Sequence, residues 1–384
     1  MSTFTRSVTY FTLIFFIISC VDNLDVVYQL KSKVLTIEGV VSDEIGGTYA
    51  RIQYSQSDDK NLQIIPVTKC QVEILIDNTT RIQLKEAYEG TYIPTADFKG
   101  QKGKSYQLIL KTPEGKTYQS TIEALTPVPP IKKIYQRFNK TGNLSATGDK
   151  LISSTSDVFV DFDDPAETNN YYLWTWKQYE KHDVCATCPQ GYLNSKTLEC
   201  VVVKQQYGTF PSYDYHCAGD CWDIAYDDKI NILSDVFVRG RSVIGRPIAK
   251  IPFYSEANTL VQVNQYSISK GAFDYYNLLQ SISEKTGTLT DTPPAPIIGN
   301  IANVNSASEV VVGYFMATGS NSANYLIERS LNINDATFTS RLDHPLFYEP
   351  DLGAGSPPLF EVRAPRQICK EGKNRTSKAP AGWK

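Results

Sequence analysis

The sequence predicts an all-β protein with two β-sandwich domains, an Ig-like N-terminal one and a larger C-terminal one that carries one inserted helix and a cysteine-rich insertion. Three observations support this fold class. The 384 residues include 24 tyrosines, 16 phenylalanines, 20 prolines and 23 glycines, a composition that favours strands and turns. Short β-prone runs recur between Gly, Asp, Asn and Pro residues, as in sandwiches and barrels. A helical period of apolar residues occurs clearly in one stretch, about residues 268–285.

Residues 1–19 are predicted to be a lipoprotein signal peptide. An apolar run that follows one basic residue ends at Ile18, and small Ser19 stands directly before Cys20. The apolar run is too short to cross a bilayer, which takes roughly 20 residues. We therefore expect cleavage before Cys20 and lipidation of its sulfur, for example with palmitate, followed by a lipidated tether over residues 20–33. The alternatives are an uncleaved anchor and a plain secretory peptide with a chance cysteine.

A lipidated chain of this kind is exported, so we expect it at the outer membrane, on the cell surface or on the periplasmic face. The net charge is −3, with 38 basic and 41 acidic residues interleaved along the chain. No basic surface that would recruit nucleic acid is expected from this distribution. At roughly 100–200 residues per domain, the mature chain has room for two or three domains.

Residues 34–126 are predicted to form the first sandwich. The segments that indicate its type are residues 37–41, 66–74, 89–92 and 103–108. Together they resemble the immunoglobulin-like module of carboxypeptidase-regulatory or collagen-adhesin type, in which a tyrosine after a glycine packs the core. The resemblance implies a spacer or docking face, and a passive stalk is the simplest interpretation. Cys70 stands alone in a strand-like stretch that suits a buried apolar thiol, so we predict that it is free.

Residues 127–131 contain three prolines and are predicted to be a stiff, extended linker. The second sandwich is expected over residues 132–331. In its first part Asp161, Asp163 and Asp164 stand close together. They invite a calcium-site interpretation, because calcium takes six or more oxygen ligands. The full alternating pattern of a calcium loop is missing, and an ordinary Asp-Pro turn is favoured instead.

Tyr172, Trp174 and Trp176 alternate with a period of two, so they share one face of a predicted strand. If that face is exposed, it is a binding platform for sugar rings or a hydrophobic partner. If it is buried, it is a core strand like the tryptophan strand of immunoglobulin folds. Burial is the favoured interpretation.

A polar insertion, residues 180–221, holds five cysteines, and a sixth lies near the end of the chain. These six are Cys185, Cys188, Cys200, Cys217, Cys221 and Cys369. The close pairs in the insertion, with His182 and His216 nearby, also satisfy the crude spacing of a zinc module. Export favours oxidation, so we predict disulfides that staple an insertion with little core of its own. The sequence leaves their connectivity open.

The predicted helix at about residues 268–285 carries an apolar stripe and begins after Ser269, a suitable N-cap. We expect the stripe to seal one end or edge of the second sandwich. The run from Val310 to Phe315 is predicted to be a buried strand of the same domain. Residues 332–384 are predicted to be an irregular tail that Cys369 pins back.

Six segments in the right order resemble the exported lipoprotein family known as domain of unknown function 4249. They are residues 126–131, 171–174, 265–269, 272–276, 293–301 and 312–315. The resemblance covers nearly the whole mature chain, and the cysteine insertion and the tail around Cys369 are similar to a subgroup. It implies an outer-membrane or surface lipoprotein, often encoded beside TonB-dependent receptors. The family has no established activity, so it transfers no catalytic residue.

The leading functional hypothesis is a non-enzymatic binding or accessory subunit of a TonB-dependent transport system. A structural or adhesive envelope lipoprotein is the alternative. An envelope hydrolase has less support, because the chain has only three histidines and neither an H-E-x-x-H nor a G-x-S-x-G motif, although paired carboxylates such as Asp163 and Asp164 suit glycosidase chemistry. No catalytic residue, metal site or cofactor is assigned.

Overall fold

The computed structural model describes residues 33–57, 62–144, 150–204, 207–283, 297–338 and 366–384. Strands dominate these residues, so the predicted all-β class is confirmed. The predicted signal peptide, Cys20 and nearly all of the tether lie outside the described residues. In the described part of the chain, no helix combines the length and the apolar character that a membrane crossing needs.

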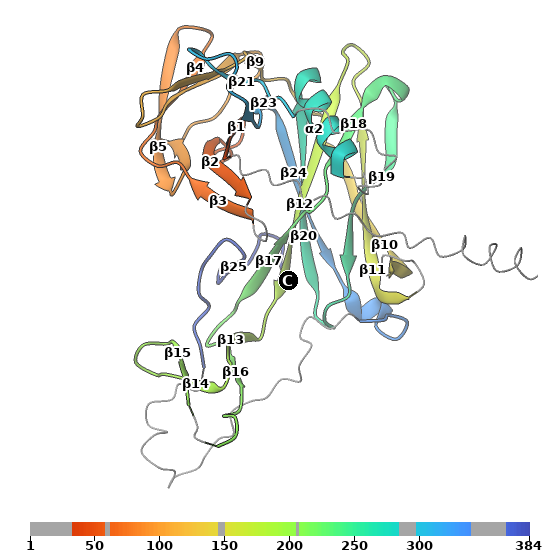
Figure 1. Cartoon of the computed structure of the whole chain (residues 1–384). Helices are drawn as coiled ribbons and strands as arrows, with labels where there is room; N and C mark the ends of the chain where they lie inside the picture. Colours follow the sequence, from red (N-terminus) through yellow and green to blue (C-terminus); the bar gives the residue numbers. More distant parts are fainter. Residues whose placement is uncertain (1–32, 58–61, 145–149, 205–206, 284–296, 339–365) are drawn as a thin grey trace, which may run out of the picture.

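The first sandwich uses nine strands in sequence and three that return later in the chain. The nine are β1 (Val34–Ser42), β2 (Tyr49–Ser57), β3 (Leu62–Pro66), β4 (Gln71–Ile76), β5 (Thr80–Tyr88), β6 (Thr91–Pro94), β7 (Ser105–Lys111), β8 (Thr117–Ser120) and β9 (Glu123–Ala124). With β21 (Ile301–Asn303), β22 (Val311–Val312) and β23 (Phe315–Thr318) they form one 12-stranded sheet around a single apolar core (Figure 1). Alternate residues of β7 are buried, as the pleat of a strand with one core face requires.

The three returning strands were assigned by the sequence analysis to the second domain, and the structure places them in the first. Strands β22 and β23 run parallel beside β1, with Leu35 opposite Val311 and Gly39 opposite Phe315. The Phe315 side chain is fully buried in the first core. An apolar run predicts that a strand is buried, but it does not identify the sheet that the strand joins.

The second sandwich packs a three-stranded sheet against a six-stranded one. The smaller sheet contains β10 (Ile131–Leu144), β11 (Leu151–Asp163) and β19 (Ser242–Pro252). The larger contains β12 (Tyr171–Lys181), β17 (Trp222–Tyr226), β18 (Asn231–Ser234), β20 (Thr259–Ile268), β24 (Ser320–Ile327) and β25 (Arg375–Thr376). One core cluster draws side chains from both sheets, so the two faces are the halves of one sandwich. Short 3-10 turns follow β18 (Asp235–Phe237) and β24 (Arg329–Asn332).

The predicted helix is confirmed as α2 (Lys270–Ser283). The Ser269 hydroxyl accepts a hydrogen bond from the Ala272 amide at 3.1 Å, as an N-cap does. Its apolar face packs in one cluster with Leu173 of the second sandwich and with Val40 and Met316 of the first. The helix therefore fills the junction between the two sandwiches, rather than an outer edge of one (Figure 1).

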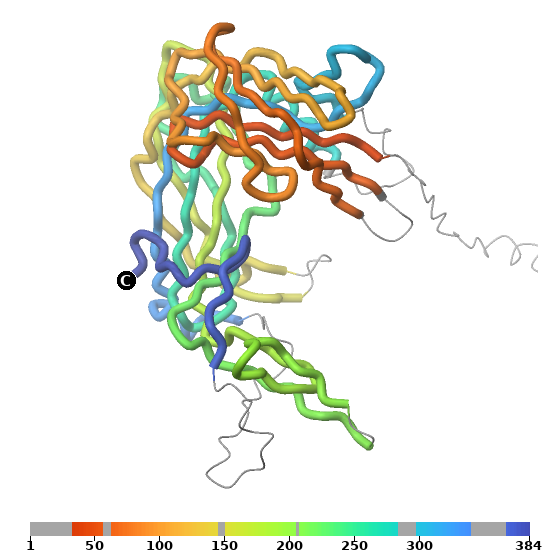
Figure 2. Tube along the Cα trace, turned by 90° about the vertical axis from the view of Figure 1, so that its left-hand side faces the viewer, coloured from red at the N-terminus to blue at the C-terminus, as the bar shows by residue number. Residues whose placement is uncertain are grey.

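The cysteine insertion projects from the base of the second sandwich as a narrow arm (Figure 2). It contains two small sheets, β13 (Val184–Cys188) with β16 (Tyr213–His216), and β14 (Gly191–Leu193) with β15 (Cys200–Val202). We call these residues, 182–221, the cysteine arm. Among its described residues, a small cluster of buried side chains forms around Leu193 and Tyr215.

The end of the chain was predicted to be irregular, but residues 366–384 return to the second sandwich. Strand β25 pairs with β17 through Trp222 and Asp223. The Trp383 ring lies 5.7 Å from the Trp222 ring, and Asn324 donates a hydrogen bond to the Ala381 carbonyl at 2.7 Å. The predicted pinning of the tail by Cys369 is part of this contact.

Candidate functional site

The aromatic strand that the sequence offered as a binding platform lies inside the second core. Tyr172 and Trp174 are each 1% exposed, and Trp176 is half-buried against the same cluster. The platform interpretation is therefore wrong for Tyr172 and Trp174, and the favoured alternative, a core strand, is the one that the structure has. The reason is that a second sheet, β10-β11-β19, covers the aromatic face of β12.

The three neighbouring aspartates bind separate protein donors and do not converge on one point. Asp161 accepts from the Gly245 amide, Asp163 accepts from the Ser242 hydroxyl, and Asp164 accepts from the Tyr172 hydroxyl, at 2.7, 2.7 and 2.6 Å. Lys132 also pairs with Asp163, and this bond lowers the pKa of that carboxyl. These carboxylates order the turns around β11, in agreement with the turn interpretation.

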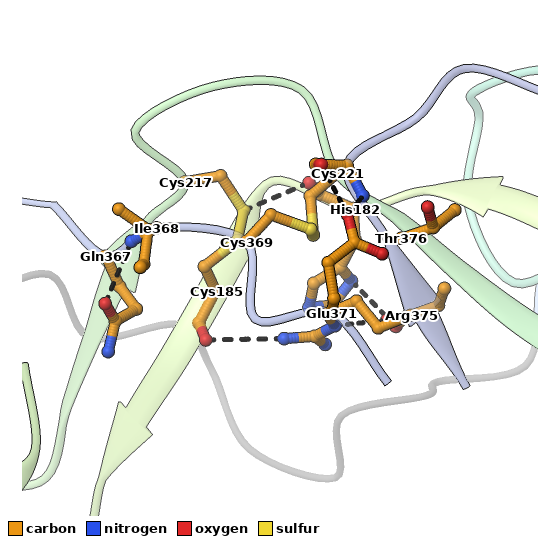
Figure 3. Close-up of a disulfide and its surroundings, with 12 residues drawn as sticks. His182, Cys185, Cys217, Cys221, Gln367, Ile368, Cys369, Glu371, Arg375 and Thr376 are labelled. Carbon is orange, nitrogen blue, oxygen red and sulfur yellow. Dashed lines mark hydrogen bonds and ion pairs between the residues drawn. A yellow bond between two sulfur atoms is a disulfide. The ribbon is translucent and has the colours of Figure 1, made fainter. Parts of the chain in front are cut away.

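All six predicted cysteines form disulfides: Cys185 with Cys217, Cys188 with Cys200, and Cys221 with Cys369. Cys70 is free and buried, as predicted. The sulfurs of Cys185, Cys217 and Cys221 lie within 4.8 Å of one another, which brings two disulfides side by side at the base of the arm (Figure 3). A disulfide sulfur is not a thiolate, so this cluster does not offer the ligand set of a zinc site.

The tail braces the same region with hydrogen bonds. Arg375 binds Asp223 at 2.7 Å and donates to the Cys185 carbonyl at 3.3 Å (Figure 3). Gln367 is 2% exposed, and its side chain donates to the Leu198 carbonyl at 2.8 Å. The cysteine arm is thus fixed to the sandwich by covalent and polar contacts together.

Two crossings of the chain between the sandwiches lie side by side. The first is the proline linker and the second is Gly319, whose amide donates to the Thr126 carbonyl at 3.1 Å. A Cβ on Gly319 would lie 2.5 Å from that same carbonyl oxygen, so only glycine permits this approach. The Ser267 amide bonds the Gly319 carbonyl at 3.0 Å, which ties both crossings to β20.

Gln265 connects the linker to the second core. It is fully buried, accepts a hydrogen bond from the Trp174 indole at 3.0 Å and donates one to the Pro129 carbonyl at 2.9 Å. Each of these residues belongs to one of the segments that carry the family resemblance. Some of the residues that carry the resemblance therefore form the hydrogen bonds that hold the two sandwiches together.

A second polar group, around Glu123, holds the returning strands. Tyr314 donates to the Glu123 carboxylate at 2.9 Å, and Asn300 bonds both Glu123 and the Phe315 backbone. Burial raises the pKa of Glu123, while its hydrogen bonds oppose the rise. Gly313 has a φ of +111°, and a Cβ there would lie 2.0 Å from the Ile37 carbonyl oxygen. The junction is consequently a rigid, closely packed region.

Beside this rigid region lies a cavity of about 370 Å³, between β1, β2, β12, β20 and α2. We call it the junction cavity. Three tyrosines and four carboxylates line it, with one lysine: Tyr49, Tyr266 and Tyr276; Glu38, Glu44, Asp227 and Asp228; and Lys229. No histidine or cysteine is among its lining residues. The tyrosine rings can pack against a ligand, and the negatively charged carboxylates can accept hydrogen bonds from it.

The electrostatics of the junction cavity follow from burial. Desolvation, together with a smaller effect of the neighbouring Asp228 charge, raises the pKa of Asp227 to about 6, although backbone hydrogen bonds oppose the rise. Burial likewise raises the pKa of Tyr266 and Tyr276, so both hydroxyls stay protonated. Glu38 accepts from the Tyr49 hydroxyl at 2.5 Å and from Arg51 at 3.0 Å.

Sequence reasoning did not find this cavity. Its lining comes from residues near 40, 175, 228, 266, 276 and 316, which no local pattern brings together. The one available signal is Tyr276, which lies on the predicted apolar stripe of the helix but carries a hydroxyl. A hydroxyl on a stripe does not by itself identify a cavity.

Comparison with protein families identifies the family of the chain. The family model described as Domain of unknown function (DUF4249) matches residues 22–323, a span that includes the first sandwich, the cysteine arm and the second sandwich up to the start of β24. No curated protein matches the chain. The matched residues contain the junction and every residue named above as lining its cavity.

Proposed function

Because the chain belongs to the family described as a domain of unknown function, DUF4249, we propose that it is a non-enzymatic outer-membrane lipoprotein that binds a small ligand in the junction cavity. We further propose that it serves as an accessory subunit of a TonB-dependent transporter. The observation that carries the binding role is the junction cavity itself, a cleft that lies between rigidly packed elements of both sandwiches.

Three features support a ligand site there. Ligand pockets concentrate at domain interfaces and typically measure roughly 300–1,000 Å³. The junction cavity lies at such an interface and measures about 370 Å³. Its walls come from elements that glycine contacts and buried hydrogen bonds hold in place, so the ligand would meet preorganised groups.

The anchor supports the transporter role. If Cys20 carries lipid, a tether of 14 residues, 20–33, leads from the lipid to β1, which starts at Val34. An extended tether of that length spans at most about 50 Å. The first sandwich then stays near the membrane, where a barrel protein would meet the junction, and the cysteine arm points away from the β1 side of the molecule.

The alternative, a structural or adhesive lipoprotein, shares the anchor and the fold and needs no ligand. A hydrolase gains nothing from Asp163 and Asp164, because protein donors already occupy both carboxylates. Acid–base chemistry in the cavity would rest mainly on its carboxylates, such as Asp227. The binding role uses the tyrosines as well, so it accounts for more of the site.

The anchor and the partner are tested in the same cells. We expect wild-type protein to fractionate with the outer membrane and to incorporate labelled palmitate, and the Cys20→Ser variant to lose both properties. Affinity purification in mild detergent is expected to recover a β-barrel receptor with the wild type. The matched control is Gln265→Glu, a substitution at the junction of the two sandwiches that leaves Cys20 in place. This variant should still incorporate palmitate and fractionate with the outer membrane.

Recovery of no barrel protein, together with unchanged nutrient uptake in a deletion strain, would contradict the transporter role. Palmitate incorporation into Cys20→Ser would contradict the anchor. Hydrolysis of an envelope glycan by the pure protein, abolished by Asp227→Asn, would replace the binding role with an enzymatic one.

A further inference from the structure

We propose that the junction cavity recognises an organic cation, a guanidinium or ammonium group on a short arm. This inference deepens the proposed function, since it rests on the cavity being a ligand site and names the class of ligand. Three observations support it: the excess of carboxylates around the cavity, the tyrosine rings on its walls, and the contact of the Arg51 guanidinium with Tyr49 and Glu38 nearby.

The charge of the cavity selects against anions. Four carboxylates and one lysine, Lys229, line the cavity. The nearby Arg51 forms an ion pair with one of the carboxylates, Glu38, at 3.0 Å. Among the described residues, neither Asp227 nor Asp228 forms an ion pair with a basic side chain. An anionic ligand entering this space would meet uncompensated negative charge, whereas a cation would relieve it.

Asp227 is the carboxylate whose charge a bound cation would stabilise most. It is half-buried, its backbone amide bonds the Trp176 carbonyl at 3.1 Å, and Asp228 stands beside it. Two adjacent carboxylates with one partly desolvated repel each other, and a bound cation converts that repulsion into attraction.

The tyrosines add a second kind of attraction. A cation over an aromatic ring is attracted by the negative π face, and the attraction is stronger when water is excluded. Tyr49, Tyr266 and Tyr276 place three rings on the walls. Their hydroxyls remain protonated, so the rings carry no negative charge of their own and act on a cation through their π faces.

The rim of the cavity already shows this recognition mode. The Arg51 guanidinium lies 5.3 Å from the centre of the Tyr49 ring and 3.0 Å from the Glu38 carboxylate. Tyr266 and Asp227 offer the same pairing of tyrosine ring and carboxylate on another part of the cavity wall, and among the described residues no basic side chain forms an ion pair with Asp227. A ligand cation would complete the second pair as Arg51 completes the first.

The test uses the full-length protein in detergent and two peptides of equal shape. Isothermal titration calorimetry measures binding of acetyl-Ala-Arg-Ala-amide and of its counterpart with citrulline in place of arginine. Citrulline keeps the planar head group and removes the charge. We expect the arginine peptide to bind at least tenfold more tightly than the citrulline peptide, and a neutral disaccharide such as maltose to bind less well than the arginine peptide.

Variants assign the effect to the cavity. Asp227→Asn is expected to reduce the affinity for the arginine peptide at least tenfold, while Asp163→Asn, an exposed carboxylate of β11, leaves it unchanged. Tyr276→Phe keeps the ring and should retain most of the affinity. Near-ultraviolet circular dichroism of each variant confirms that it is folded.

The pH dependence gives an independent readout. Since burial holds the pKa of Asp227 at about 6, affinity for the cation should rise between about pH 5 and pH 7 as the carboxyl ionises, and Asp227→Asn should lack this rise. Equal binding of both peptides, binding of neither, or an unaffected Asp227→Asn would overturn the proposal. Any of these results leaves recovery of a transporter unaffected, so failure of the ligand class is distinguishable from failure of the transporter role.

Discussion

The junction and the cysteine arm are stabilised in different ways within one chain. The junction has an apolar cluster around α2 that draws on both sandwiches, and buried polar groups such as Gln265 connect its parts. The cysteine arm has a small buried cluster around Leu193 and Tyr215, with the Cys188–Cys200 disulfide in it and two more at its base. Where apolar burial is plentiful the chain uses packing, and where it is scarce the chain uses covalent bonds.

This contrast has a consequence for stability. Substitutions at the junction should affect unfolding of the whole protein, because two cores depend on it. Substitutions in the cysteine arm should open the arm alone. Four changes test this distinction, from the largest expected effect to the smallest.

Gly313→Ala should have the largest effect. A methyl group at this position would lie 2.0 Å from the Ile37 carbonyl oxygen, and the φ of +111° is strained for alanine. We expect a loss of about 4 kcal/mol in the free energy of unfolding, measured by urea denaturation. Gly103→Ala is the control, since Gly103 has a φ of +80° but open space around it. A similar loss in both variants would show that backbone conformation, and not the close contact with β1, is what matters.

Arg329→Met tests the point where the second sandwich meets the cysteine arm. Arg329 is 1% exposed and binds both oxygens of Glu180 near the end of β12, at 2.6 and 3.1 Å. Removal of the guanidinium leaves a buried carboxylate unpaired and should cost about 3 kcal/mol. In Arg81→Met, which breaks an exposed pair with Glu73, the cost should stay under about 1 kcal/mol. Equal costs would mean that burial of the ion pair does not control its contribution.

Cys188→Ser combined with Cys200→Ser should destabilise the cysteine arm alone. This disulfide closes a sequence separation of 12 residues, and its loss should cost about 2 kcal/mol locally. Hydrogen exchange should accelerate in β13 to β16 and stay unchanged in β12 and β20. Faster exchange in β20 would show that the arm and the sandwich unfold as one unit, against the comparison drawn above.

Asp227→Asn should have the smallest effect on stability, visible as a change in pH dependence. The pKa of Asp227 is raised to about 6 from an ordinary 3.8, so between these values the folded protein holds a proton that the unfolded chain has lost. Stability from this group is therefore greatest below about pH 4 and falls as the pH rises to about 6, by about 1 kcal/mol after allowance for solvent screening. Thermal unfolding of both proteins at the two ends of this window checks the sign. An identical slope in the variant would assign the pH dependence to another group.

Local patterns in the sequence predicted individual elements well. The apolar stripe and Ser269 predicted α2, and the closely spaced cysteines, in a chain that we expect to be exported, predicted oxidised sulfurs. The isolated setting of Cys70 predicted a buried thiol. Each of these inferences depends on side-chain periodicity, capping or redox chemistry within a short stretch of chain.

Long-range arrangement was predicted poorly. The strand from Val310 to Phe315 was recognised, but its partner β1 was not. The aromatic face of β12 was recognised, but the sheet that covers it was left as one of two alternatives. The junction cavity was missed, because Glu38, Asp227 and Tyr276 approach one another only after both sandwiches and α2 have packed.

The sequence by itself determined which segments are strands, where the helix begins and which cysteines are oxidised, because these depend on interactions among near neighbours. Tertiary structure alone decided that the chain returns to the first sandwich, which cysteines pair and where the cavity opens. The entropic cost of closing a loop changes slowly with its length, so separation along the chain does not choose among distant partners. Which distant segments pair is decided by the packing of both cores as a whole, because every segment contributes side chains to it.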